Sequence, residues 1–274
     1  MQDQRQQRCI RDFGEQWTAF PDNRGYYGSK ELLEDICRPL IEAEELRGCR
    51  VAEIGAGTGR IVNMLLDAGA SHVVAVEPSQ AVRALERNVR ERSEQVTVLQ
   101  TTGEQIPPNA ELDWALSIGV LHHIPEPEPV VQAMYRALRP GGRILIWLYG
   151  REGNRLLLFF LLPLRTITQR LPHRVLNLLV SLIDLPLRLY MTLCRHFPLP
   201  LRGYLCNVLG HFNPAERRLV IYDQLNPAYA KYYSREEAVD LLRKCGFQDI
   251  QVHHRHGYSW TVMATKPDCA RAAA

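Results

Sequence analysis

Several features that would quickly assign a sequence to a class are missing from this 274-residue chain. The first residues, 1–11, contain no apolar run before a small-residue cleavage site, so we expect no secretory signal and a cytoplasmic protein. The seven cysteines are odd in number and form no C-x-x-C pair, which argues against a disulfide framework and a zinc site. No stretch reaches the roughly 18 apolar residues that a membrane span requires.

Lysine and acidic residues are also scarce in one segment, residues 151–213. This segment holds eight arginines and no lysine, and its only acids are Glu152 and Asp184, whereas the whole chain has a net charge of only +3. The segment is therefore chemically distinct from the rest. Its shortage of lysine and its wide apolar face do not suit an open phosphate groove, so a nucleic-acid partner is disfavoured.

What the sequence does contain is an alternating α/β pattern. Between residues 48 and 150, short apolar strands alternate with helical stretches, which is typical of βαβ units and a parallel sheet. Strands are predicted at 50–54, 72–77, 96–101, 113–118 and 143–148. Residues 140–142, with the sequence P-G-G, are expected to end a helix and turn into the fifth strand. The pattern stops after residue 150 and resumes with a helix at 235–245 and two strands at 247–256 and 258–266, which form a hairpin.

A glycine-rich turn follows the first predicted strand, with Glu53 just ahead of Gly55, Gly57 and Gly59. Glycine is needed where the chain folds back tightly and a cofactor lies against bare backbone, and the next helix offers free N–H groups. Dinucleotide enzymes use G-x-G-x-x-G, but this chain has Arg60 where the third glycine would stand. The spacing therefore disfavours a nicotinamide oxidoreductase, and a glycine-rich turn without a ligand is the alternative reading.

Three further features support a cofactor site: Glu77 at the end of the second strand, the stretch L-S-I-G-V-L-H-H-I at 116–124, and A-L-R-P-G-G-R-I at 137–144. Together with the glycine turn, they closely resemble the class I S-adenosylmethionine-dependent methyltransferases, such as the small-molecule ubiquinone and menaquinone methyltransferases. The resemblance covers roughly residues 48–150. It implies an α/β, Rossmann-like fold with a seven-stranded, mostly parallel sheet, a terminal antiparallel hairpin strand and, here, a helical insertion after strand five.

The resemblance also implies an activity and a cofactor set. We expect methyl transfer from S-adenosylmethionine to a small hydrophobic or amphipathic acceptor, with O-, N- and C-methylation all open. A non-catalytic cofactor-binding scaffold is the alternative. The methionine part would be held by Glu53, Gly55, Gly57 and Gly59, and the ribose by Glu77. Gly103 and Glu104 would contact the adenine, and Ser117 and Gly119 would lie near the sulfonium. The family usually has Asp where Thr102 stands.

Candidate residues for the chemistry come from two histidines and from aromatic clusters. His122 or His123 could act as a general base, because imidazole titrates near neutral pH, or both could pack structurally. We expect no metal site, since strand alternation separates His253 from its neighbouring histidines. Phe13 and Trp17 resemble lid residues. The predicted acceptor contacts are Tyr26, Tyr27, Tyr229, Tyr233, His254 and His256.

These expectations divide the chain into an N-terminal lid segment (1–47), a cofactor-binding core (48–150), a helical insertion (151–233) and a closing helix and hairpin (234–266). In the insertion, polar residues from Arg174 to Arg195 recur every three or four positions, which predicts one polar stripe on an otherwise apolar helix. Pro186 is expected to kink or divide that helix. The segment 151–213 could be a lid over the acceptor, a homodimer surface or a contact with a membrane surface.

Overall fold

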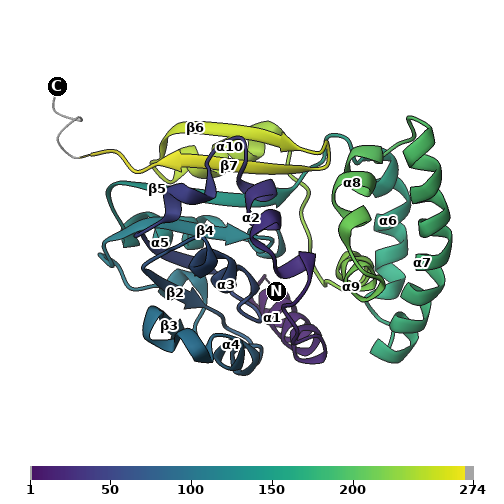
Figure 1. The fold of residues 1–274 in the computed structure, drawn as a ribbon, viewed down its shortest axis with the longest axis horizontal. Coiled ribbons are helices and arrows are strands. Elements are labelled where there is room, and N and C mark those ends of the chain that lie inside the picture. The colour runs from purple at the N-terminus through teal and green to yellow at the C-terminus, as the bar shows by residue number, and fades with distance from the viewer. Residues whose placement is uncertain (1, 269–274) are drawn as a thin grey trace.

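The computed structural model describes residues 2–268, which fold around a seven-stranded sheet (Figure 1). The strand order is β3-β2-β1-β4-β5-β7-β6, and neighbouring strands are parallel except where β7 pairs with β5 and β6. This confirms the predicted fold class. The strands are β1 (Arg50–Ile54), β2 (His72–Val76), β3 (Val96–Leu99), β4 (Leu112–Ile118), β5 (Leu138–Tyr149), β6 (Gln248–Arg255) and β7 (Ser259–Thr265).

Helices cover the sheet and form a separate group beside it (Figure 1). The α-helices are α1 (Gln2–Ala19), α2 (Lys30–Cys37), α3 (Arg60–Asp67), α4 (Val82–Asn88), α5 (Glu128–Ala137), α6 (Arg155–Thr168), α7 (His173–His196), α8 (Arg202–Asn207), α9 (Pro214–Leu225) and α10 (Arg235–Lys244). Short 3₁₀ helices are η1 (Tyr26–Gly28), η2 (Ala43–Leu46), η3 (Arg90–Gln95), η4 (Gly103–Gln105), η5 (Leu121–His123) and η6 (Leu209–His211).

The central strands are apolar on both sides because helices bury both faces of the sheet. Val51 of β1 belongs to a core shared with α2 and α3, whereas the next residue, Ala52, belongs to a core shared with α5 and α10. Successive strand residues point to opposite faces, so a strand in the middle of such a sheet needs a continuous apolar run. The layers hold the carboxyl ends of β1 and β4 side by side, where the strand order reverses direction and open α/β sheets bind ligands.

The insertion between β5 and α10 forms the helices α6, α7, α8 and α9, drawn at the right of Figure 1. Leu158 and Leu161 of α6, Leu176 of α7 and Tyr222 of α9 share one buried cluster with Tyr149 of β5. This packing attaches the insertion to the end of the central strands.

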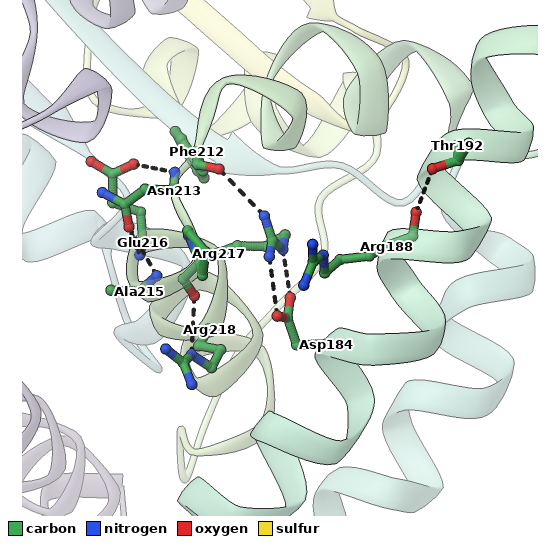
Figure 2. A network of polar contacts seen from close by, with 10 residues as sticks. Asp184, Arg188, Thr192, Phe212, Asn213, Ala215, Glu216, Arg217 and Arg218 are labelled. Atoms are coloured by element: carbon green, nitrogen blue, oxygen red, sulfur yellow. Dashed lines mark hydrogen bonds and ion pairs between the residues drawn. The ribbon is translucent and has the colours of Figure 1, made fainter.

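A buried ion pair joins two of these helices (Figure 2). Arg217 of α9 donates to Asp184 of α7 through Nε at 2.5 Å and Nη2 at 3.0 Å, and Nη1 donates to the Phe212 carbonyl at 3.3 Å. Asn213 caps α9 by accepting from the backbone amides of residues 215 and 216. Asp184 is therefore an interior contact rather than part of a solvent-facing stripe.

Two features of the structure differ from the sequence-based expectations. The helix α7 passes through Pro186 without a division, because Pro186 lies on the exposed side, where water can solvate the carbonyl of Leu182 that loses its partner. The expected turn at 140–142 lies within β5, since Leu138 already pairs with Leu112 ahead of an irregularity in the ladder.

Candidate active site

The glycine turn after β1 has the backbone geometry that only glycine adopts readily. Gly55, Gly57 and Gly59 have φ values of +79°, +54° and +80°. A Cβ on Gly55 would lie 2.4 Å from a methyl of Val120, and one on Gly59 would lie 2.6 Å from Leu85. The turn therefore needs glycine both for its conformation and for its close packing.

Glu77, just after β2, connects that strand to the turn. Its Oε2 accepts from the backbone amide of Gly57 at 2.7 Å, and its Oε1 accepts from the amide of Ser79 at 2.9 Å. The side chain is 6% exposed. Two amide donors fix the carboxylate at the rim of the turn, and its remaining lone pairs are free to accept hydroxyl groups.

Glu53 lies beneath the turn and is fully buried, with 0% exposure. Among the described residues, neither carboxylate oxygen has a hydrogen-bond partner. Burial raises the pKa of this carboxyl group from its usual 4.5 to about 8, because the charged form loses its solvation. Burial therefore favours the protonated form of Glu53 at neutral pH.

A cavity of about 280 Å³ opens above the turn. Five of the predicted cofactor residues line it, namely Gly55, Gly57, Glu77, Gly103 and Gly119. The other four lie outside its wall. Glu53 is beneath the turn, Gly59 caps α3, Ser117 donates to the Ile54 carbonyl at 3.3 Å, and Glu104 accepts from Gln6 of α1 at 3.2 Å.

Helix α1 closes one side of this cavity. Phe13 and Trp17 line it, as expected for lid residues, and the Trp17 ring lies 3.5 Å from where a Cβ on Gly57 would be. Gly14 packs so closely on Ser79 that a Cβ would approach it to 3.0 Å. The first helix is thus held directly against the glycine turn.

Of the two candidate histidines, only His123 lines the cavity. Its Nδ1 donates to the Tyr229 carbonyl at 2.8 Å, whereas Nε2 is buried and has no partner among the described residues. The carbonyl therefore places the ring proton on Nδ1, so that Nε2 carries a lone pair and is enclosed by the surrounding side chains. Burial lowers the pKa of His123, which keeps the ring neutral. His122 packs behind it, with its ring centroid 3.8 Å from that of Tyr149.

The wall facing the insertion contains residues that the sequence analysis missed. Tyr149 donates its hydroxyl to Asp223 Oδ2 at 2.9 Å, and Gln16 of α1 donates to Asp223 Oδ1 at 3.1 Å. Tyr149 and Asp223 both line the cavity. Their signal in the sequence is weak, because the two residues are 74 positions apart and only the fold brings them together.

A second polar group extends this wall. Arg165 of α6, itself buried, donates to the Tyr232 hydroxyl at 2.8 Å and to the Gln224 carbonyl at 2.8 Å. Tyr232 stacks on Tyr149 with the ring centroids 5.4 Å apart. An arginine inside an apolar helix was the one signal in the sequence that could have revealed this contact.

The far end of the cavity is lined by Arg255 and Tyr258. Arg255 has a side chain that is 3% exposed and pairs with Asp35, and its Nε donates to the Asp35 carbonyl at 3.0 Å. His256 also contacts Asp35, at 2.7 Å, and so lies behind the wall. A charge-balanced group of residues thus closes this end.

Of the six predicted acceptor contacts, Tyr27 alone lines the cavity. Tyr26 stacks on His211 at 4.9 Å, and His254 stacks on Trp260 at 4.2 Å. Tyr229 contributes its backbone carbonyl to His123, and Tyr233 is buried against the end of β5. The structure places these residues near the wall or away from it, but not in it.

In the part of the chain that the structure describes, no three or more His, Cys, Asp or Glu side chains gather in an arrangement that could hold a metal ion. Six of the cysteines are free thiols, and Cys269 lies outside the described residues.

Comparison with known protein families identifies the domain that contains this turn and the central strands. Residues 52–146 match the model of the methyltransferase domain family. The chain carries a class I methyltransferase domain. Its cofactor is S-adenosylmethionine. The match ends within β5, so helix α1 and the insertion lie outside the part that the family model describes.

Curated relatives of the methyltransferase domain cover about half of this chain. An uncharacterized methyltransferase of Mycobacteroides abscessus is 30% identical over 117 residues, which are 42% of this chain and 45% of that protein. A ubiquinone biosynthesis O-methyltransferase of Pseudomonas aeruginosa is 29% identical over 137 residues, 49% of this chain and 58% of that protein. The chain thus spans about half the length of these relatives.

A solved structure extends the similarity of fold beyond the methyltransferase domain. The phosphoethanolamine N-methyltransferase 2 of Haemonchus contortus, in complex with phosphomonomethylethanolamine and S-adenosylhomocysteine, has a TM-score of 0.51 and 16% identity. The match covers 87% of this chain and 52% of that one. At this identity the similarity concerns the fold alone.

Proposed function

We propose that this chain transfers a methyl group from S-adenosylmethionine to a small amphipathic acceptor whose nucleophilic atom carries a proton. The observation that carries the proposal is His123 in the wall of the same cavity as the glycine turn, with its ring proton fixed on Nδ1 by the Tyr229 carbonyl. A neutral imidazole held in one tautomer is suited to accept a proton from a hydroxyl or amine. A hydroxyl acceptor suits this arrangement best, because a hydroxyl gains most as a nucleophile when its proton is removed.

The residues present fit the cofactor. Gly55, Gly57 and Gly119 leave bare backbone along the cavity, Gly103 lies where the adenine is expected, and the Glu77 carboxylate is placed to accept the ribose hydroxyls. When bound, the cofactor supplies an electrophilic methyl group on a sulfonium. The protein then has to hold the acceptor atom in line with that methyl and exclude water, tasks for which α1 and the insertion are placed.

The acceptor pocket combines aromatic walls with a few polar groups. Trp147, Tyr149 and Leu157 provide apolar surface, and Asp223 and Arg255 provide polar contacts at separate points. Such a lining favours a flat or branched apolar body with one or two polar substituents. Trp147 Nε1 is buried without a partner among the described residues.

The test is to incubate the purified chain with S-adenosylmethionine carrying a labelled methyl group and with fractionated cell extract, and then to identify the labelled product by mass spectrometry. We expect label in a small molecule and not in protein or nucleic acid, and loss of transfer in a His123→Phe variant. Binding of the cofactor without any label transfer would support the scaffold alternative, and label recovered in protein or RNA would overturn the proposed acceptor class.

A further inference from the structure

Helix α7 carries a wide apolar face that the described chain leaves uncovered. Its exposed leucines recur every three or four residues, so they lie on one side of the helix. Figure 1 places α7 at the outer edge of the molecule, away from the sheet. The α7 apolar face consists of Leu178, Leu182, Leu185, Leu189 and Leu193, which are 63%, 63%, 71%, 66% and 41% exposed.

This face is not the side by which α7 packs on the protein. Leu176, Val180, Met191 and Cys194 form the buried stripe, and Asp184 in the same stripe pairs with Arg217 of α9. Helix α6 adds exposed aromatic surface, since Phe159 and Phe160 are 73% and 65% exposed. Exposed apolar surface of this extent in a folded chain marks a contact with something else.

The charges around the face are of one sign. Exposed arginines flank the two helices: Arg155 begins α6, Arg195 lies in the last turn of α7, and Arg170 and Arg174 lie at the turn between the helices. Of the two acids in 151–213, Asp184 is buried in its ion pair. Within this segment the exposed positive charge is therefore almost uncompensated.

We infer that the α7 apolar face and the flanking arginines dock on an anionic lipid bilayer, with α7 lying in the plane of the interface. Leucine and phenylalanine side chains enter the boundary between headgroups and acyl chains, while arginines bind the anionic headgroups. A second copy of the chain fits less well. A two-fold interface would bring the same arginine-rich surface against itself, with no exposed acid of the segment to balance it, because Asp184 is buried and Glu152 is partly buried and accepts from the Arg235 amide.

The same helix does not cross the bilayer in this arrangement. Within residues 2–268, residues 174–196 form the one helix long and apolar enough to span a membrane, with a mean hydropathy of 1.4. Spanning would pull α7 off α9 and separate Asp184 from Arg217, whose Nε lies 2.5 Å from Oδ1. An unpaired carboxylate in hydrocarbon is far costlier than an apolar face at the interface.

The docking surface lies close to the cavity through α6. Leu157 lines the cavity, whereas Leu156 and Phe159, one and two residues away on the same helix, are 59% and 73% exposed. An acceptor dissolved in the bilayer would therefore reach the cavity along α6. This last step rests on the proposed function, but the membrane contact does not.

The experiment measures sedimentation of the full chain with vesicles of phosphatidylcholine alone and of phosphatidylcholine mixed with phosphatidylglycerol. We expect binding to the mixed vesicles at low salt, weaker binding as salt rises, and little binding to phosphatidylcholine alone. Because an arginine near an anionic surface strengthens binding roughly fivefold, the triple variant Arg170→Gln, Arg174→Gln and Arg195→Gln should bind roughly a hundredfold more weakly.

Two further variants make the test specific. Leu182→Glu with Leu189→Glu should abolish vesicle binding while leaving S-adenosylhomocysteine binding intact, which shows that the fold is preserved. The matched control, Arg83→Gln with Arg87→Gln and Arg90→Gln, removes three exposed arginines from α4 and η3 and should bind vesicles like the unmodified chain. No binding to mixed vesicles at low salt would overturn the inference. A dimer in sedimentation equilibrium that the leucine variant dissociates would also overturn it, and would assign the face to a second copy.

Discussion

A carboxyl group without a hydrogen-bond partner is costly to bury, and Glu53 is fully buried at the end of β1. The raised pKa expresses that cost, because the protein accepts a proton instead of a charge. A ligand whose ammonium group comes close to the turn would favour the ionised form and so lower the pKa. Cofactor binding should therefore release part of a proton near neutral pH.

Glu53→Gln should stabilise the ligand-free protein at alkaline pH. The folded chain keeps the carboxyl proton up to about pH 8, whereas the unfolded chain loses it near 4.5, so the free energy of unfolding falls as pH rises between these values. The slope from this group is at most about 1.4 kcal/mol per pH unit. Chemical denaturation at pH 5 and pH 8 checks this: glutamine should remove the contribution. An unchanged slope would mean that Glu53 is already ionised in the folded protein.

His123→Phe should reduce the rate of methyl transfer by about a hundredfold, the usual contribution of a general base, without weakening cofactor binding. The matched variant is His122→Phe, because that ring lies outside the cavity wall and its nitrogens have no partner among the described residues. It should keep most of the activity. Since burial lowers the pKa of His123, the rate of the unmodified enzyme should begin to fall at a more acidic pH than the titration of a free imidazole would give. Equal losses in both variants would indicate a packing role for the pair.

At the scale of single residues, the sequence predicts the glycines and Glu77 because their roles depend on the local backbone. Gly55 and Gly57 belong to one turn, and Glu77 directly follows β2, at the end of the same βαβ unit. Asp223 and Arg255 cannot be read in this way. Each reaches the cavity from a segment far along the chain, and its neighbours in sequence carry no motif.

Among the elements, α1 joins the cofactor turn to the insertion. Trp17 covers Gly57, and Gln16, one residue earlier, donates to Asp223 of α9. A helix that contacts both sides of a cavity can open only by breaking both contacts together. We therefore expect entry of the cofactor and ordering of α1 to be coupled.

Trp17→Ala should weaken binding of S-adenosylhomocysteine about tenfold, which corresponds to about 1.4 kcal/mol of lost contact. The indole covers the glycine turn, and alanine leaves that side of the cavity open to water. Calorimetric titration measures the effect, with Gln7→Ala on an exposed position of α1 as the control. The same affinity in all three proteins would show that α1 does not cover the bound cofactor.

Asp184→Asn should destabilise the protein by about 3 to 5 kcal/mol, because it leaves the Arg217 guanidinium buried without its counter-charge. The two side chains are only 11% and 7% exposed. Asp240→Asn removes a partner from an ion pair with Arg243 that is 47% and 64% exposed, and should change stability by less than about 1 kcal/mol. Thermal unfolding of both variants provides the comparison. A small loss for Asp184→Asn would indicate that water reaches Arg217.

The elements of the core were predictable because their signals are local. The period-two and continuous apolar runs place β1, β2 and β4 within one residue of the observed bounds. The insertion was less predictable, because the sequence pattern of an apolar helix is the same whether its leucines are buried in a core or exposed to solvent. Asp184 illustrates the difficulty: periodicity assigns it to a polar stripe, whereas its contact with Arg217 makes it interior.

For the whole molecule, ligand binding should raise the melting temperature. At a concentration of S-adenosylhomocysteine about 100 times its Kd, binding adds about 2.7 kcal/mol of stability, which is about 5 to 10 °C for a chain of this size. NAD at the same concentration should cause no shift, because the turn lacks the spacing of dinucleotide enzymes. Differential scanning fluorimetry with both compounds tests this. Stabilisation by NAD alone would indicate a nicotinamide oxidoreductase instead.

The pairing of β5 with β7 has a consequence for how the chain avoids self-association. These strands pair along seven residues, from Arg143 opposite Thr265 to Tyr149 opposite Ser259, across the whole insertion. Until that pairing forms, β5 is an open edge whose middle residues, Ile144, Leu145 and Ile146, are those that an incoming strand from another molecule would seek. A chain cut before Ser259 should therefore keep its glycine turn and yet accumulate as insoluble assemblies. In this architecture the final hairpin protects the edge of β5 from intermolecular pairing. Because the long insertion separates β5 from β7 in the sequence, that protection forms only after this whole segment has been accommodated.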